Sequence, residues 1–202
     1  MKIICIGRNY ANHARELGNQ IPDDPVVFCK PDSSILQPRN PFVIPPWSQE
    51  IHHEIEFLVR IGRVGKYIDQ KHALSYIDAI TVGIDFTARD LQNELKEKGF
   101  PWEKSKGFDG SAVIGKWILG NPKKNKNYQI TLLKNKVIAQ NGNTSQFIFS
   151  MEEIISHVSK FFTLKKGDII FTGTPSGVGP ITAGDQLEGR LDGESLLSLN
   201  IR

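Results

Sequence analysis

Short apolar segments rich in β-branched residues recur along this chain, and Gly, Pro and Asn residues separate them. Such segments are typical of strands. We predict strands over 2–7, 25–30, 52–62, 79–86, 167–173, 185–191 and 196–201, and a hairpin over 128–140 that turns at 134–136. Helices are predicted over 9–17, 69–77, 87–99 and 151–162.

The two kinds of element do not alternate regularly, which argues against a doubly wound parallel sheet. We therefore expect a mainly β protein with a few short helices (α+β), built on a mixed, largely antiparallel sheet. No repeat or linker divides the chain, so we expect residues 1–202 to form a single domain. In the helix predicted over 87–99, Thr87 and Asp90 fit a capping box, and Gly99 marks the end.

The composition limits the kinds of partner and compartment. The net charge is only +3 over 202 residues, and there is no polybasic arm, so we do not expect nucleic acid to be a partner. Cys5 and Cys29 lie in apolar segments, which favours buried free thiols and a reducing compartment. The first segment, MKIICIGRNY, has too few apolar residues before Arg8 for a signal peptide. No apolar run approaches the length of a membrane span. We expect a cytoplasmic protein without a membrane partner.

The segment IHHEIEFLVR places two carboxylates, Glu54 and Glu56, on one face of a predicted strand. Neighbouring carboxylates repel each other and resist burial, so this face either is open to water or holds a cation. The closest lysines in the sequence, Lys66 and Lys71, follow a turn. A hard divalent metal ion suits carboxylate oxygens, and Asp85, near the end of the next predicted strand, is the leading third ligand. A lone Asp at a strand end is also common as a cap or turn residue.

Three other features allow both a functional and a structural interpretation. His13 and Glu16 lie three residues apart, on one face of a predicted helix. They could be a general base and the carboxylate that orients it, or an ordinary exposed pair. The segment 171–180 can form a loop whose N–H groups bind an anion, or a simple turn. His52 and His53 are either metal ligands or surface residues.

Seven segments, taken together, are more specific than any one of them. They occur in this order over essentially the whole chain: GRNYANHARELG, FCKPDSSI, HHEIEFLVRIG, GIDFTARDLQ, WEKSKGFDGSAVIG, NGNTSQFIFS and GDIIFTGTPSGVGP. Together they resemble the fumarylacetoacetate hydrolase family, and above all its short single-domain acylpyruvate hydrolases and oxaloacetate decarboxylases. Two segments depart from the family pattern, GKW at 115–117 and KNK at 134–136, and neither contains a proposed ligand.

The resemblance implies a mixed β-roll catalytic domain, a homodimer, and Mg²⁺ or Mn²⁺ bound by Glu54, Glu56 and Asp85. It also implies three catalytic residues: His13, Glu16 and Lys106, the last of which is four residues after Trp102. The substrate-binding residues that it implies are Arg8, Lys30, Arg89, Gln92, Gly173, Thr174 and Pro175.

The expected substrate is a β-keto acid of the 3-acylpyruvate type, and the expected reaction is metal-dependent cleavage of its carbon–carbon bond, with oxaloacetate decarboxylation as a related activity. Two alternatives stay open. One is an isomerase or tautomerase acting on 2-hydroxyhepta-2,4-diene-1,7-dioate or oxaloacetate. The other is a non-enzymatic, metal-stabilised dimer.

Overall fold

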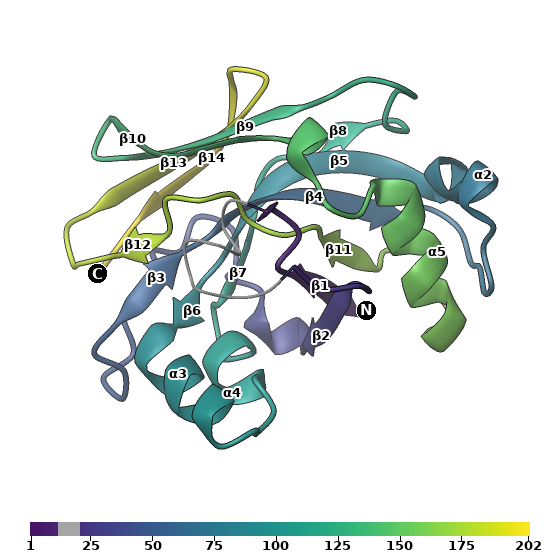
Figure 1. Ribbon diagram of the computed structural model, residues 1–202. Helices are drawn as coiled ribbons and strands as arrows, with labels where there is room; N and C mark the ends of the chain where they lie inside the picture. The colour runs from purple at the N-terminus through teal and green to yellow at the C-terminus, as the bar shows by residue number, and fades with distance from the viewer. Residues whose placement is uncertain (12–20) are drawn as a thin grey trace.

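The computed structural model describes residues 1–11 and 21–202 (Figure 1). The helix predicted over 9–17 therefore lies mostly outside the described residues. The strands are β1 (Ile3–Gly7), β2 (Val26–Lys30), β3 (Ile51–His53), β4 (Ile55–Ile61), β5 (Ile77–Asp85), β6 (Thr87–Ala88), β7 (Ala112–Ile114), β8 (Ile118–Leu119), β9 (Gln129–Lys134), β10 (Val137–Asn143), β11 (Ile169–Phe171), β12 (Gly179–Pro180), β13 (Gln186–Leu191) and β14 (Glu194–Asn200). The helices are α2 (Gln70–Ala73), α3 (Arg89–Glu97), α4 (Glu103–Lys106) and α5 (Met151–Phe161), with 3₁₀ turns η1 (Asp32–Ser34), η2 (Leu74–Tyr76) and η3 (Thr144–Gln146).

The strands form a large sheet with two smaller sheets against it. The seven-stranded sheet has the order β2-β1-β11-β4-β5-β7, and β8 also pairs with β5. Among the described strands of this sheet, only β1 and β11 are parallel, and all other neighbours are antiparallel. The smaller sheets have the orders β10-β9-β13-β14 and β12-β3-β6. The predicted mixed, largely antiparallel fold is confirmed.

The main core lies where the four-stranded sheet crosses β4 and β5 (Figure 1). Alternate residues of β5, Ile80, Val82 and Ile84, enter this core together with Phe86, as the period-two pattern predicts. The opposite face of β5 carries Thr81, Gly83 and Asp85. The strands of the large sheet also carry a second, smaller apolar cluster: Ile3, Cys5, Leu58, Ala112, Ile169 and Phe171. The carboxylate of Asp85 therefore points away from the main core.

The residues at the two hairpin turns have the backbone conformations that tight turns require. Asn135 and Lys136 both have positive φ (54° and 68°), as the two central residues of a type I′ turn require, and they join β9 to β10 where the sequence predicts. Asp192 and Gly193 (φ 49° and 86°) join β13 to β14 in the same way. Each turn fixes the register of its own hairpin, and β9 and β13 then pair to join the two hairpins in the four-stranded sheet.

One predicted strand is divided. The sequence predicts a continuous strand over 52–62, but the chain leaves the three-stranded sheet after His53 and enters the large sheet at Ile55. Glu54 is the residue between the two sheets. Each half is paired on both sides: β3 lies between β12 and β6, and β4 lies between β11 and β5. The bend lets one short segment place Glu54 and Glu56 in a pocket instead of on a flat strand face.

The predicted cap of α3 is wrong, although the helix is present. The helix begins at Arg89 with Ala88 at the N-cap, and no side chain caps it. Thr87 belongs to β6, where its hydroxyl accepts a hydrogen bond from Lys106 Nζ (2.6 Å). Asp90 accepts a hydrogen bond from Ser48 Oγ (2.8 Å). Gly99 (φ 66°) follows the helix as predicted.

Both cysteines are free, as predicted; Cys5 is buried, whereas Cys29 is only partly buried. Within the described residues, no helix is long and apolar enough to cross a membrane.

Candidate active site

The pairing of β4 with β5 positions two of the three carboxylates of the site. Glu56 pairs with Gly83, and Asp85 lies two residues further along the same face of β5. A Cβ on Gly83 would lie 2.5 Å from Val113 O and 2.6 Å from Leu58 Cδ2, so this position has no room for a side chain. Glu54 joins from the break between β3 and β4. Glu54, Glu56 and Asp85 are all buried, and each offers an oxygen within 4.8 Å of the others.

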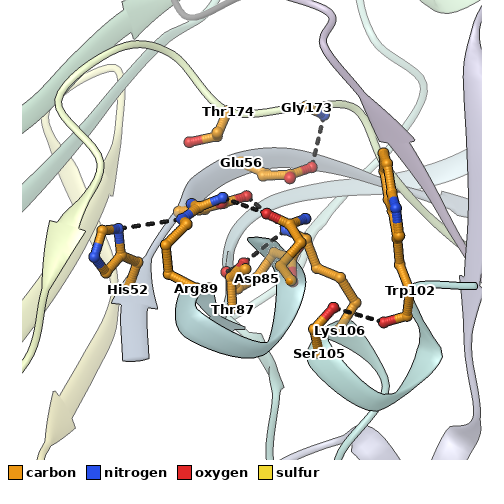
Figure 2. Close-up of polar contacts among 12 residues, drawn as sticks. His52, Glu56, Asp85, Thr87, Arg89, Trp102, Ser105, Lys106, Gly173 and Thr174 are labelled. Atoms are coloured by element: carbon orange, nitrogen blue, oxygen red, sulfur yellow. Dashed lines mark hydrogen bonds and ion pairs between the residues drawn. The ribbon is translucent and has the colours of Figure 1, made fainter. Parts of the chain in front are cut away.

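Three cations lie against these carboxylates. Lys106, from α4, donates to Glu54 Oε2 (2.7 Å), Asp85 Oδ2 (2.7 Å) and Thr87 (Figure 2). Arg89, from the first turn of α3, donates through Nη2 to Glu54 Oε1. Lys30 Nζ lies 2.7 Å from Asp85 Oδ1, without hydrogen-bond geometry. The positive charge next to Glu54 therefore comes from residues remote in sequence, not from the nearby Lys66 and Lys71.

Glu56 differs from the other two carboxylates. It is only 2% exposed, it accepts a hydrogen bond from Gly173 N (2.6 Å), and it makes no ion pair with any described residue. Burial and the neighbouring Asp85 raise the pKa of Glu56 well above its usual value. Burial alone would lower the pKa of Lys106, but Asp85 and Glu54 outweigh it and raise that pKa. The lysine is therefore a permanent cation, while the charge of Glu56 is poorly compensated by the protein.

This donor set fits a divalent metal ion. Oxygen ligands of high charge are those that Mg²⁺ and Mn²⁺ prefer. Three buried carboxylates with converging oxygens supply them, and a bound cation would stabilise the ionised form of Glu56, which burial disfavours. Glu54, Glu56 and Asp85 are therefore the residues that would hold the ion.

The loop after β11 closes one side of the site. Gly173 has φ 102°, a conformation that favours glycine, and its N–H points at Glu56. Thr174 follows in the cavity wall, and Figure 2 shows its side chain beside Glu56 and Arg89. Pro175 lies outside the wall and packs against Gly142, where an added Cβ would lie 2.6 Å from the proline ring.

Gln140 holds this loop, and the sequence analysis did not identify it. Its Oε1 accepts from Ile55 N (2.9 Å) and His53 Nδ1 (3.0 Å), and its Nε2 donates to Thr174 Oγ1 and Pro175 O (both 2.9 Å). The main-chain partners fix the orientation of the amide, because Ile55 N can only donate and Pro175 O can only accept. Gln140 thus connects the loop to the strand that carries the glutamates.

A cavity opens above the carboxylates. It is lined by Ile6, Gly7, Arg8, Phe28, Glu54, Glu56, Asp85, Arg89, Gln92, Lys96, Trp102, Lys106 and Thr174. Gln92 accepts a hydrogen bond from Arg89 Nη1 (2.5 Å). An ion held by the carboxylates and an anion beside Thr174 would both be within this one cavity.

The comparisons with known proteins agree with this geometry. Residues 2–200 match the model of the fumarylacetoacetate (FAA) hydrolase C-terminal domain. The chain belongs to the fumarylacetoacetate hydrolase family. Its predicted β-roll fold is confirmed: the fumarylpyruvate hydrolase of Pseudomonas aeruginosa, solved in complex with Mn²⁺ and pyruvate, superposes with a TM-score of 0.91 at 36% identity, over 100% of this chain and 89% of that one.

Relatives in this family carry the names of several enzymes. The oxaloacetate decarboxylase of Dictyostelium discoideum mitochondria is 44% identical over 93% of this chain and 87% of the relative. The oxaloacetate tautomerase of Escherichia coli is 40% identical over 96% of this chain and 90% of the relative. The family therefore includes hydrolase, decarboxylase and tautomerase relatives of this chain.

The structure brings most of the residues implied by the family resemblance to one place. Of these, Arg8, Arg89, Gln92, Thr174 and Lys106 line the cavity with the three carboxylates. The buried Lys30 lies beside Asp85 and donates to Ser111 Oγ (3.0 Å), but it does not line the cavity.

His13 and Glu16 lie outside the described residues. His52 and His53, the two histidines considered as metal ligands, have partners that are not carboxylates of the metal site. His53 donates to Gln140, and His52 donates through Nε2 to Glu50 Oε1 (2.8 Å). Burial lowers the pKa of both.

Proposed function

We propose that this protein is a Mg²⁺- or Mn²⁺-dependent enzyme that cleaves the carbon–carbon bond of 3-acylpyruvate-type β-keto acids, with oxaloacetate decarboxylation as a related activity. The observation that carries the proposal is the contact of Lys106 with both Glu54 and Asp85, inside the cavity that Glu56 and Thr174 also line. It places a permanent cation beside the predicted metal ligands, in a buried site.

The reaction requires a site that stabilises an enolate. Breaking the C3–C4 bond leaves its electron pair on C3, and the charge spreads to the 2-oxo oxygen as the enolate of pyruvate. The Lys106 ammonium, whose three donors are taken by Glu54, Asp85 and Thr87, supplies a fixed positive charge close to this developing negative charge. Such electrostatic stabilisation is strongest in a site that excludes water. When bound, the metal ion would supply Lewis-acid stabilisation of the same oxygen. Thr174 and the N–H groups of its loop would bind the substrate carboxylate.

Hydrolysis and decarboxylation differ in one requirement. An acylpyruvate needs water to add to its distal carbonyl, and His13, oriented by Glu16, is the predicted base for that step. Oxaloacetate instead loses CO₂ and needs no water. We therefore expect His13→Ala to reduce acylpyruvate hydrolysis by about 10²–10⁴-fold and to affect decarboxylation much less. Equal fractional losses of both activities would show that His13 is not the base that activates water.

A panel of acylpyruvates and oxaloacetate, assayed with and without Mg²⁺ or Mn²⁺, tests the proposal as a whole. We expect Lys106→Met to lose about 10²–10³-fold in every reaction that the wild type catalyses. Lys104→Met is the matched control, because Lys104 lies on the same short helix with its side chain exposed. A wild type that turns over no member of the panel, or full activity in a folded Lys106→Met variant, would refute the proposal.

A second reaction, keto–enol tautomerisation of oxaloacetate, is favoured by the relatives named tautomerases. It removes a proton from C3 and passes through the enolate of oxaloacetate itself, which carries its charge on the equivalent 2-oxo oxygen, and it breaks no carbon–carbon bond. Ultraviolet absorbance of the enol form, followed together with CO₂ release, separates it from decarboxylation. Faster enol–keto exchange without CO₂ release would assign the tautomerase activity.

We also propose that the protein is a cytoplasmic homodimer. This rests on the family resemblance and on the composition, since Cys5 and Cys29 are free thiols.

A further inference from the structure

The side-chain amide of Gln140 has all of its hydrogen-bonding positions occupied. Its Oε1 accepts from Ile55 N and His53 Nδ1, and its Nε2 donates to Thr174 Oγ1 and Pro175 O (both 2.9 Å). A primary amide offers two acceptor and two donor positions, so none is left over. Gln140 is therefore held in one orientation, with its nitrogen toward Thr174.

This orientation decides what the hydroxyl of Thr174 can do. An amide nitrogen only donates, so the Thr174 oxygen is the acceptor in this bond, and its single proton is left for a different acceptor. Within the described residues, its one other hydrogen-bond contact is with Pro175 O at 3.5 Å, which is long for a hydroxyl donor. Pro175 O already receives the second N–H of Gln140. The Thr174 hydroxyl is thus an available donor in the wall of the cavity.

A second threonine of the same loop is arranged differently. Thr172 is buried, and its hydroxyl donates to Phe57 O (2.7 Å), so its proton is used within the fold. A hydroxyl that only holds the loop in place is expected to donate to the main chain in this way. Thr174 lies two residues further along, beside Glu56 and Arg89, and its proton is not used like this (Figure 2).

The strand that carries Gln140 is irregular at the point where this residue turns inward. The pairing of β10 with β9 shifts between Ile138 and Gln140. Bulges of this kind are frequent next to active sites, where they redirect a side chain. The irregularity directs the amide of Gln140 at the loop of Thr174.

We propose that Gln140 is a positioning residue that makes the Thr174 hydroxyl a hydrogen-bond donor to the carboxylate of a bound 2-oxo acid, and so sets the affinity of the site for that carboxylate. This rests on the proposed function, in which the loop of Thr174 binds the substrate carboxylate. Gln140 occupies the acceptor side of Thr174, and it also supplies the donor that Pro175 O requires. Without Gln140, the Thr174 hydroxyl would turn to Pro175 O and would be lost to the substrate.

The test measures the binding of pyruvate, a 2-oxo acid that the proposed reactions do not cleave. Isothermal titration calorimetry at saturating Mn²⁺ gives its affinity for the wild type, Gln140→Met, Thr174→Val and the double variant. Thr174→Val removes the donor and should weaken pyruvate binding by about 10- to 100-fold, as for a hydrogen bond to a charged group. Gln140→Met misdirects the donor and should weaken binding by about 5- to 50-fold.

The double variant separates positioning from a merely structural role. If Gln140 acts through Thr174, the double variant should bind pyruvate within about threefold of Thr174→Val alone, because the two losses are then not additive. A Gln140 that only supports the fold would weaken binding by the same factor with or without the Thr174 hydroxyl. Gln186→Met, at an exposed strand position, is the matched control and should bind pyruvate as the wild type does.

A further variant, Gln140→Glu, keeps the side-chain size and the acceptor for Ile55 N, and it replaces Gln140→Met if that variant does not fold. Its ionised carboxylate only accepts, so the Thr174 hydroxyl would donate to it, and pyruvate binding should fall at least as far as in Thr174→Val.

Three results would overturn the inference: no pyruvate binding by the wild type, wild-type affinity in Thr174→Val or in a folded Gln140 variant, or additive losses in the double variant. Turnover is measured separately. A protein that shows the expected binding pattern but cleaves no β-keto acid would refute the proposed function and leave this inference standing.

Discussion

Replacing Gln140 with Met should destabilise the protein by several kcal/mol without changing the size of the side chain much. Gln140 is 1% exposed, and its amide makes hydrogen bonds to four different groups. Met has a similar length but can neither donate nor accept these bonds. The substitution therefore removes hydrogen bonds without creating a large cavity.

The expected loss of stability follows from the main-chain groups that would lose their hydrogen bonds to Gln140. Ile55 N is a buried main-chain donor with no alternative acceptor in its strand position, and an unsatisfied group of this kind costs about 1–3 kcal/mol. Pro175 O loses its donor but retains a weak one, since Thr174 Oγ1 lies 3.5 Å away, so we assign it about 1 kcal/mol. The expected loss in free energy of unfolding is therefore about 2–4 kcal/mol, a large share of the 5–15 kcal/mol typical of a domain.

Urea denaturation followed by circular dichroism measures this loss. Gln186→Met is the matched control, because Gln186 also lies in a strand, is exposed, and makes no side-chain hydrogen bond within the described chain. It should change the free energy of unfolding by less than about 0.5 kcal/mol. A Gln140→Met variant within about 1 kcal/mol of the wild type would show that the loop is held by other contacts, and the reasoning would be wrong.

Three further predictions concern the metal, pH and assembly. Glu56→Gln should weaken Mn²⁺ binding by more than about tenfold, because it removes a buried anionic ligand; calorimetry giving an unchanged affinity would contradict the ligand set. Asp168→Asn should lower the free energy of unfolding at pH 7 by about 1–3 kcal/mol, because Asp168 accepts a hydrogen bond from Lys2 N (2.8 Å) and forms an ion pair with Lys2 Nζ. Burial alone would raise the pKa of Asp168, but its hydrogen bonds to Lys2 and Lys165 outweigh burial and lower that pKa. The contribution of Asp168 to the free energy of unfolding is therefore complete above about pH 4, the pKa of an unfolded Asp, and is lost as the pH falls through the lowered pKa. Urea midpoints that show the same loss at pH 3 as at pH 7 would refute this. Light scattering should find a dimer at micromolar concentration, and a monomer would overturn the proposed assembly.

Local patterns in the sequence were sufficient to predict most of the strands. The alternation in β5 separates Ile80, Val82 and Ile84 from Asp85 correctly, because a strand that is apolar on one face has a single register that buries it. The turn at Asn135 and Lys136 was found for the same reason, since a hairpin turn depends on adjacent residues only. Glu54 was misplaced in a continuous strand because β3 and β4 pair with strands far away in sequence, which a window of neighbours cannot show.

Gln140 shows how a local irregularity hides a residue of the site. Period-two alternation would put Ile138 and Gln140 on one face of β10, yet Ile138 is 62% exposed and Gln140 is buried. The register of β9 and β10 shifts between these two residues, so the bulge turns Gln140 inward.

The charges around Glu54 illustrate why the cations, unlike the carboxylates, could not be placed from local sequence. Glu54 and Glu56 lie in one short segment, so their proximity follows from spacing alone. Lys106 and Arg89 reach them from two different helices, and only the packing of α3 and α4 against β3 and β6 brings their side chains together. A lysine buried without these carboxylates would lose its charge, and the carboxylates buried without the lysine would bind protons. Each helix is therefore held in place partly by the charge it carries, and the same contacts that stabilise the fold place a fixed cation where the enolate of the proposed reaction would form.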